Sequence, residues 1–119
     1  MRPGLASRVG AAGGFSAVAL GAFGAHALRP ALEHDHMTAI WQTAVFYHFI
    51  HAVMLWILGG QRPFRVMAWW SFLAGTLLFS GSLYLMAITG LKWLGVITPF
   101  GGGGFLLGWA LLCRQPPEV

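Results

Sequence analysis

The chain has 119 residues, enough for one domain, and 57% of them are hydrophobic while only 8% are charged. A soluble domain carries about 25% charged residues, so this chain has too few to cover its surface in water, and the lipid bilayer is its natural solvent. The net charge of +4 comes from basic residues that stand singly at the ends of apolar runs, which excludes the clustered basic surface of a nucleic-acid-binding protein.

Four segments are apolar enough to cross a membrane, and each approaches the length of about 20 residues that a spanning helix needs. In chain order they cover about residues 9–28, 42–60, 66–89 and 94–113. The connections around GQRP and TGLK are short, so successive helices should run antiparallel. We therefore expect one all-α domain over residues 1–119, an integral membrane bundle of four antiparallel helices.

The basic residues predict the orientation of this bundle, because cytoplasmic loops are enriched in Lys and Arg. One end of the predicted bundle has Arg2, Arg8, Arg62, Arg65 and Arg114. The other end has Arg29 and Lys92, with acidic residues nearby. Both termini should therefore be cytoplasmic. A cleaved signal peptide is the alternative for the first segment, but its apolar run exceeds the usual length of about 7–15 residues.

Small residues recur along one side of several predicted spans, and membrane helices pack closely where small side chains meet. These residues are Gly14, Ala17, Gly21 and Ala25 in the first span, Gly81 in the third, and Gly101, Gly104 and Gly108 in the fourth. We expect them to form helix contacts, either within the chain or with a partner.

The fourth span contains the helix-breaking pair Thr98 and Pro99, followed by four glycines. Proline is favourable at the first helical position and threonine is a good N-cap, so we expect the helix to begin here after a short interfacial piece. The alternative is one longer helix kinked at Pro99. The glycines should pack closely against the first span, although a broken helix whose amide ends face a ligand would use them too.

The run Glu33-His34-Asp35-His36 resembles a chelating sequence, but consecutive residues of a helix point in different directions. We therefore predict no metal site. The polar stretch over residues 33–42 should open the second helix outside the hydrocarbon. Trp41, Val45 and Phe49 form an apolar stripe that could lie along the membrane interface.

Three histidines, His26, His48 and His51, fall near the outer ends of the first two spans. An ionisable residue within the membrane is a functional candidate by default. His26 opposite a second histidine could ligate haem, and one histidine with Tyr47 or Tyr84 could bind a quinone. The interpretation we favour is hydrogen bonding between helices, which buried polar groups require. On that interpretation no cofactor is predicted.

Four motifs occur in an order that resembles the domain of unknown function 423 family of small membrane proteins, of the YgdD-like and transmembrane-protein-256-like kind. They are GAFGAH at residues 21–26, TAVFY with a later histidine at residues 43–51, LFSGSLY at residues 78–84 and TPFGG..F..GW at residues 98–109. The resemblance covers nearly the whole chain. It implies an integral inner-membrane protein in bacteria, or an organellar or endomembrane one in eukaryotes, and brings no established reaction, cofactor or substrate.

The resemblance also separates the histidines, because His26 and His51 match the motifs of the family, whereas His48 falls where other members carry residues such as Gln. We therefore predict that His48 is incidental. The buried polar network should comprise His26, His51, Tyr47, Tyr84, Ser80 and Ser82.

The favoured function is that of a non-enzymatic accessory or assembly subunit, because the chain is small, has minimal loops and lacks a recognisable catalytic set. Its partners would be the bilayer and other membrane subunits, or a second copy of itself. The first alternative is a redox protein that binds quinone or haem near His26 and His51. The second is a small transporter that acts as an oligomer.

Overall fold

The computed structural model describes residues 1–2 and 4–114, and this part of the chain is helical without strands. The helices are α1 (Leu5–Ala25), α2 (Arg29–His34), α3 (Thr38–Gly59), α4 (Val66–Thr89), the 3-10 helix η1 (Lys92–Val96) and α5 (Thr98–Leu112). The helices α1, α3 and α4 and the continuous η1–α5 segment are each long and apolar enough to cross a membrane. The predicted all-α fold with four potential spans is confirmed.

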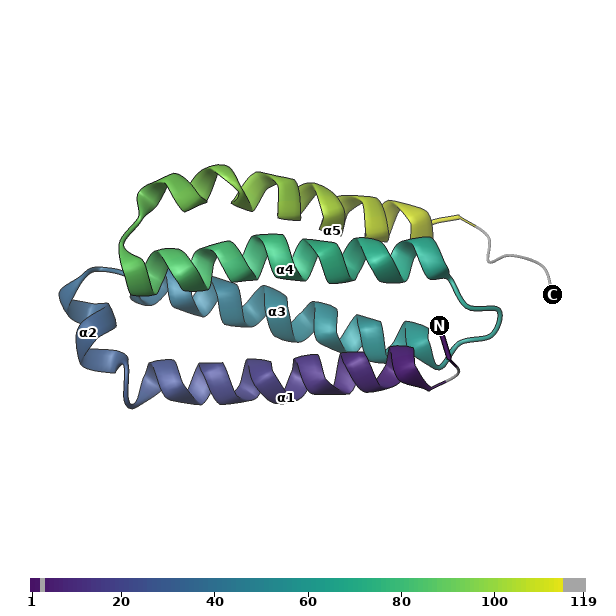
Figure 1. Cartoon of the computed structure of the whole chain (residues 1–119), viewed down its shortest axis with the longest axis horizontal. Coiled ribbons are helices and arrows are strands. Elements are labelled where there is room, and N and C mark those ends of the chain that lie inside the picture. Colours follow the sequence, from purple (N-terminus) through teal and green to yellow (C-terminus); the bar gives the residue numbers. More distant parts are fainter. Residues whose placement is uncertain (3, 115–119) are drawn as a thin grey trace.

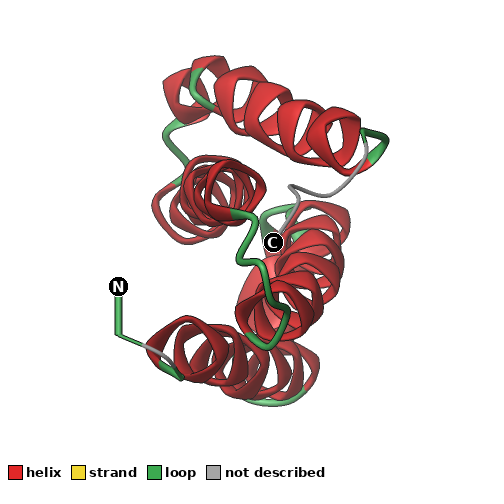
Figure 2. Ribbon diagram, turned by 90° about the vertical axis from the view of Figure 1, so that its right-hand side faces the viewer, coloured by secondary structure: helices red, strands yellow, loops and turns green. Residues whose placement is uncertain are grey.

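The four long helices lie along the longest dimension of the molecule, which measures 53 × 26 × 20 Å, and the chain reverses direction at each connection (Figure 1). The end view shows them in a zigzag row in the order α1, α3, α4, α5 (Figure 2). Each helix packs extensively on its neighbours in this row, whereas α1 and α5 form no extensive contact with each other in the described part. The bundle is therefore an open row with α1 and α5 at its edges.

The connection between the first two long helices differs from the prediction. The stretch over residues 33–42 does not open one helix, because α2 ends at His34 and α3 begins at Thr38. His36 separates them in the left-handed region, with φ of 58°. The signal for α2 was Pro30 near its start, a position that favours proline. The first helix is also shifted, and spans Leu5–Ala25 in place of residues 9–28.

The contact between α1 and α3 is made by small residues spaced three, four or seven apart, the repeat of a coiled-coil seam. On α1 these residues are Ala6, Gly10, Gly13, Ala17 and Gly24. A Cβ atom on Gly10 would overlap the backbone of Trp56, and one on Gly24 would overlap the indole of Trp41. The two helix backbones therefore approach each other as closely as glycine allows.

Only part of the predicted stripe on α1 forms contacts within the chain. Ala17 is fully buried, and a Cβ atom on Gly21 would lie 3.2 Å from Val45. In contrast, Gly14 has open space around it and Ala25 is exposed. The two stripes share Ala17 but differ by roughly 60° around the helix axis, at 100° per residue. Small residues occur on both, so their pattern did not define the rotation of α1.

The glycines of α5 pack against α4, so the predicted contact with the first span is wrong. The α4 residues that face Gly101, Gly104 and Gly108 are Phe79, Gly75 and Phe72, in that order. A Cβ atom on Gly101 would overlap the Phe79 backbone, and one on Gly104 would lie 3.1 Å from the Gly75 Cα. Gly81 makes no such contact within the chain, because nothing lies within 4 Å of a Cβ atom there, and a contact with a partner stays a prediction. The physical reason is the open row, which places α5 and α1 at opposite edges.

The start of α5 lies at Thr98, with Pro99 in its first turn. The 3-10 helix η1 precedes it, so the alternative of one long α-helix kinked at Pro99 is wrong. The predicted capping role of Thr98 is also wrong, because Ile97 occupies the N-cap position and no side chain caps the helix. The Thr98 hydroxyl instead shares a hydrogen bond of 2.6 Å with the Ser82 hydroxyl, which ties α5 to α4.

Candidate functional site

The histidines of α3 lie in the middle of the bundle, deeper than the sequence suggested. Because α3 begins at Thr38, His48 is ten residues from its start, or about 15 Å along the axis. His51 follows one turn later. Both side chains are buried, with 8% and 3% exposed. The predicted position of His48 and His51 near the outer ends of the spans is therefore wrong.

His51 joins α3 to α5. Its Nδ1 lies 2.8 Å from the Tyr47 carbonyl oxygen, and the Trp109 Nε1–H donates to its Nε2 at 3.1 Å. A carbonyl can only accept and an indole N–H can only donate, so the ring is neutral with its proton on Nδ1. The ring also stacks on Phe105 at 3.7 Å between centroids. Both nitrogens are thus already hydrogen-bonded, which favours a structural role.

His48 joins three helices, so the prediction that it is incidental is wrong. Its Nδ1 lies 2.8 Å from the Tyr84 hydroxyl of α4, and its Nε2 lies 3.2 Å from the Ser16 hydroxyl of α1. Ser16 also donates to the Gly13 carbonyl at 2.9 Å. Because Ser16 has one proton, its oxygen accepts from Nε2–H, and Tyr84 then donates to Nδ1. Ser16 was not predicted to belong to this network. A hydroxyl group among the small residues of α1 could have indicated a hydrogen bond to a neighbouring helix.

His26 does not join this network, so its predicted pairing with His51 is wrong. It is exposed directly after α1, and its side chain makes no hydrogen bond to a described residue. A Cβ atom on Gly13 would lie 3.0 Å from the Ala52 side chain, which places His51 beside the middle of α1. His26 is about 13 residues further along α1, or roughly 20 Å. Two histidine ligands for haem are therefore not brought together here.

The remaining predicted polar residues have separate roles. The Ser80 hydroxyl donates to the Ala44 carbonyl at 2.8 Å, and Ser82 bonds with Thr98 as described above. Tyr47 contributes only its backbone carbonyl to His51, and its hydroxyl bonds to no described residue. Throughout the described part, every buried side-chain nitrogen or oxygen has a hydrogen-bond partner. No group of three or more His, Cys, Asp or Glu side chains there could hold a metal ion.

A matched pair of tyrosine variants tests the His48 network. We expect Tyr84→Phe to lower the free energy of unfolding by about 1 kcal/mol, within the range measured for hydrogen bonds between membrane helices. Tyr47→Phe should leave it unchanged, because that hydroxyl has no described partner. The measurement is an SDS titration in mixed micelles. Equal effects of the two substitutions would show that Tyr84 does not stabilise the bundle through His48.

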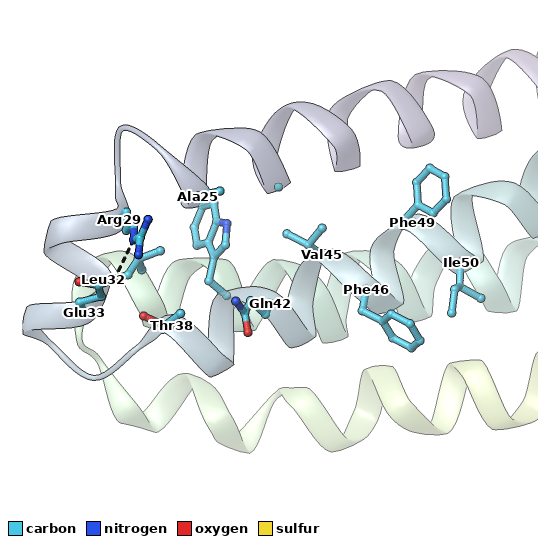
Figure 3. A pocket seen from close by; sticks show the side chains of 13 residues that line it. Ala25, Arg29, Leu32, Glu33, Thr38, Gln42, Val45, Phe46, Phe49 and Ile50 are labelled. Atoms are coloured by element: carbon cyan, nitrogen blue, oxygen red, sulfur yellow. Dashed lines mark hydrogen bonds and ion pairs between the residues drawn. The ribbon is translucent and has the colours of Figure 1, made fainter.

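An open groove of about 740 Å³ runs between α1, α2 and α3 at the end of the bundle that carries α2 (Figure 3). Arg29 and Glu33 form an ion pair of 2.9 Å at this end, and the Glu33 carboxylate raises the pKa of Arg29 through this hydrogen bond. Val45 and Phe49 line the groove further along α3. Trp41 forms part of its wall and is only 2% exposed, so this tryptophan does not lie on the membrane interface as predicted.

Comparisons with known proteins agree with the sequence motifs. The family described as "Protein of unknown function (DUF423)" matches residues 20–102. The UPF0382 membrane protein SAB0533 of Staphylococcus aureus is 42% identical over 108 residues, which cover 87% of this chain and 88% of that protein. The UPF0382 membrane protein YwdK of Bacillus subtilis is 40% identical, covering 87% and 89%. The UPF0382 inner membrane protein YgdD of Escherichia coli is 45% identical, covering 83% and 79%.

No solved structure matches the chain. The matched segment runs from the second half of α1 into the first turns of α5, and so includes the whole α3–α4 pair that holds the two buried histidines. Together with four helices of membrane-spanning length, these similarities confirm the predicted resemblance and the membrane location. The chain belongs to the DUF423 family and is a membrane protein.

Proposed function

We propose that this protein is a non-enzymatic accessory or assembly subunit of a larger complex in the bacterial inner membrane. The open row of helices carries this proposal. The edge helix α1 packs extensively on α3 alone among the long helices. The edge helix α5 packs extensively on α4 and touches α3 through His51. The outer sides of both edges are therefore free to receive further helices.

Glycines that contact no other helix of this chain support the accessory role. A Cβ atom on Gly14, Gly81 or Gly103 would meet nothing within 4 Å, although all three lie inside long helices. Glycine in a helix interior is less favourable than alanine by about 1 kcal/mol, so a glycine without a close neighbour lacks a reason within the chain. A partner helix that approaches closely at these positions would supply one.

The buried histidines agree with a structural role, because their nitrogens hold neighbouring helices together. The haem alternative has lost the ligand pair on which it depended, since His26 and His51 lie far apart. We accordingly expect the purified protein to show no Soret band in its absorbance spectrum. A Soret band whose absorbance is proportional to the protein concentration would show that haem binds, at a site other than His26 and His51.

We further propose an antiparallel crossing of the membrane with both termini cytoplasmic. Five arginines support this orientation because they occupy the ends of helices that meet at one end of the bundle, which we call the arginine end: Arg2, Arg8, Arg62, Arg65 and Arg114. Arg65 donates to the carbonyls of Leu111 and Arg114, so the start of α4 and the end of α5 lie together there. The positive-inside rule places such an end in the cytoplasm.

The single cysteine allows a direct test of this orientation. Cys113 is exposed at the arginine end, directly after α5. In spheroplasts, a membrane-impermeant maleimide should not label Cys113 until the membrane is permeabilised. A Cys113→Ser, Asp35→Cys variant carries its thiol at the opposite end and should be labelled without permeabilisation. The reverse pattern of labelling would invert the proposed orientation.

Purification of the tagged protein from native membranes in mild detergent, with mass spectrometry of what elutes, tests the accessory role. We expect another membrane protein in constant proportion to this chain. A homo-oligomer alone would replace the accessory role by self-association, which the transporter alternative requires. A monomer recovered alone under several detergents, and also after cross-linking in the intact membrane, would contradict the accessory role.

A further inference from the structure

The groove between α1, α2 and α3 changes from polar to apolar along its length. Arg29 and Glu33 lie at its α2 end, Thr38 and Gln42 follow, and Val45 and Phe49 come deeper (Figure 3). From Thr38 to the last lining residue, Ile50, the helix advances about 18 Å. Half of a hydrocarbon core of about 30 Å is about 15 Å, so the groove runs through approximately one leaflet.

Gln42 supplies a polar group without a partner on the groove wall. Its side chain is exposed and makes no hydrogen bond to any described residue, although it lies one turn inside α3. An unpaired amide that faces hydrocarbon is unfavourable, because lipid tails offer no hydrogen bonds. A ligand that presents carbonyl oxygens at this depth would satisfy the Gln42 amide.

The two charged side chains at the α2 end restrict which lipid headgroup can bind there. Arg29 and Glu33 are largely exposed, with 68% and 56% of their side chains accessible, so both can meet a ligand while they remain paired. An anionic headgroup would be attracted by Arg29 and repelled by Glu33. A headgroup with a phosphate and a primary ammonium offers a partner to each residue, and the ammonium can donate to the Glu33 carboxylate.

We propose that this groove binds one phospholipid with a zwitterionic ethanolamine headgroup. The phosphate lies at Arg29, the ammonium at Glu33, an ester carbonyl at Gln42, and one acyl chain along Val45 and Phe49. The order of groups in the lipid from headgroup to chain end is then the order of groups along the groove. This binding does not depend on the accessory role, since it uses only residues of this chain.

Two alanines of α1 provide a matched test. Ala25 lines the groove and Ala19 does not, and both are exposed. Ala25→Phe should fill the groove, whereas Ala19→Phe adds the same side chain about 120° around the helix, outside the groove lining. The full chain and each variant are reconstituted in vesicles with equal parts of phosphatidylethanolamine and phosphatidylglycerol. Native mass spectrometry then counts the lipids that each protein retains.

We expect one phosphatidylethanolamine per wild-type chain, retained by Ala19→Phe and reduced at least tenfold by Ala25→Phe. An Arg29→Gln, Glu33→Gln variant should keep a phospholipid but lose about threefold of its preference for ethanolamine, the scale of an exposed charge contact. Equal retention by all variants would mean non-specific boundary lipid and overturn the proposal. A preference for phosphatidylglycerol, or a groove filled by a protein segment, would also overturn it. Melting curves confirm that each variant is folded before its lipids are counted.

Discussion

Gly10→Ala should destabilise the protein by about 2 kcal/mol, whereas Gly14→Ala should stabilise it by up to about 1 kcal/mol. The added Cβ atom at residue 10 would overlap the backbone of Trp56, so α1 and α3 would have to move apart. Overpacking of this kind costs about 1–3 kcal/mol. At residue 14 the same atom meets open space, and the helix gains the better propensity of alanine.

Both predictions are checked by the free energy of unfolding in mixed micelles. Because the two substitutions should change it in opposite directions, each serves as the control for the other. The two residues lie on the same helix, one turn apart, so general effects of substitution on α1 are shared. If Gly14→Ala were the destabilising substitution, the seam between α1 and α3 would have the rotation first inferred from sequence. The described contacts of Gly10 and Gly24 would then be incorrect.

Phe72→Ala should destabilise the protein by about 2 kcal/mol, because it empties the point at which α3, α4 and α5 meet. Phe72 is fully buried, with its ring centroid 5.3 Å from the ring of His51 and 5.2 Å from that of Trp109. It also packs against Gly108. In a bilayer the lost transfer free energy is small, so the cost is mainly that of the cavity.

Phe15→Ala is the matched control, because Phe15 is 80% exposed on the edge helix α1 and makes no comparable contacts. Its effect on the free energy of unfolding in detergent should be below about 0.5 kcal/mol. The indole fluorescence of Phe72→Ala should also change, since Trp109 loses its neighbour. Equal stability changes for Phe72→Ala and Phe15→Ala would mean that the three helices do not meet at Phe72.

Composition and hydropathy were sufficient to predict the four spanning helices, though not α2, because each span must satisfy its backbone internally and avoid charges. The start of α5 was also predictable, since Thr98 and Pro99 are local signals. The rotation of α1 was not, because its sequence offers two small-residue stripes that both include Ala17. Which stripe faces α3 depends on the large side chains of the partner helix, such as Trp41, and on the register between helices.

The same limit explains the histidines. Ser16 and His48 are 32 residues apart, His48 and Tyr84 are 36 apart, and His51 and Trp109 are 58 apart. No local pattern specifies which of these side chains share a depth, and an error of one turn exchanges the partners. The family motifs favoured His51 over His48, but both are buried and both join helices. The groove was not predictable from the sequence either, because it forms only where α2 interrupts the polar stretch over residues 33–42.

Site-specific photo-cross-linking in native membranes tests the accessory role most directly. A cross-linker at Phe15 samples the free edge of α1 next to Gly14, and one at Leu106, which is 74% exposed, samples the edge helix α5. An accessory subunit predicts that at least one position yields a discrete cross-link to a different membrane protein. Where that position is Phe15, Gly14→Leu should abolish the cross-link while the protein stays folded. Labelling of lipid alone from both positions would contradict the role.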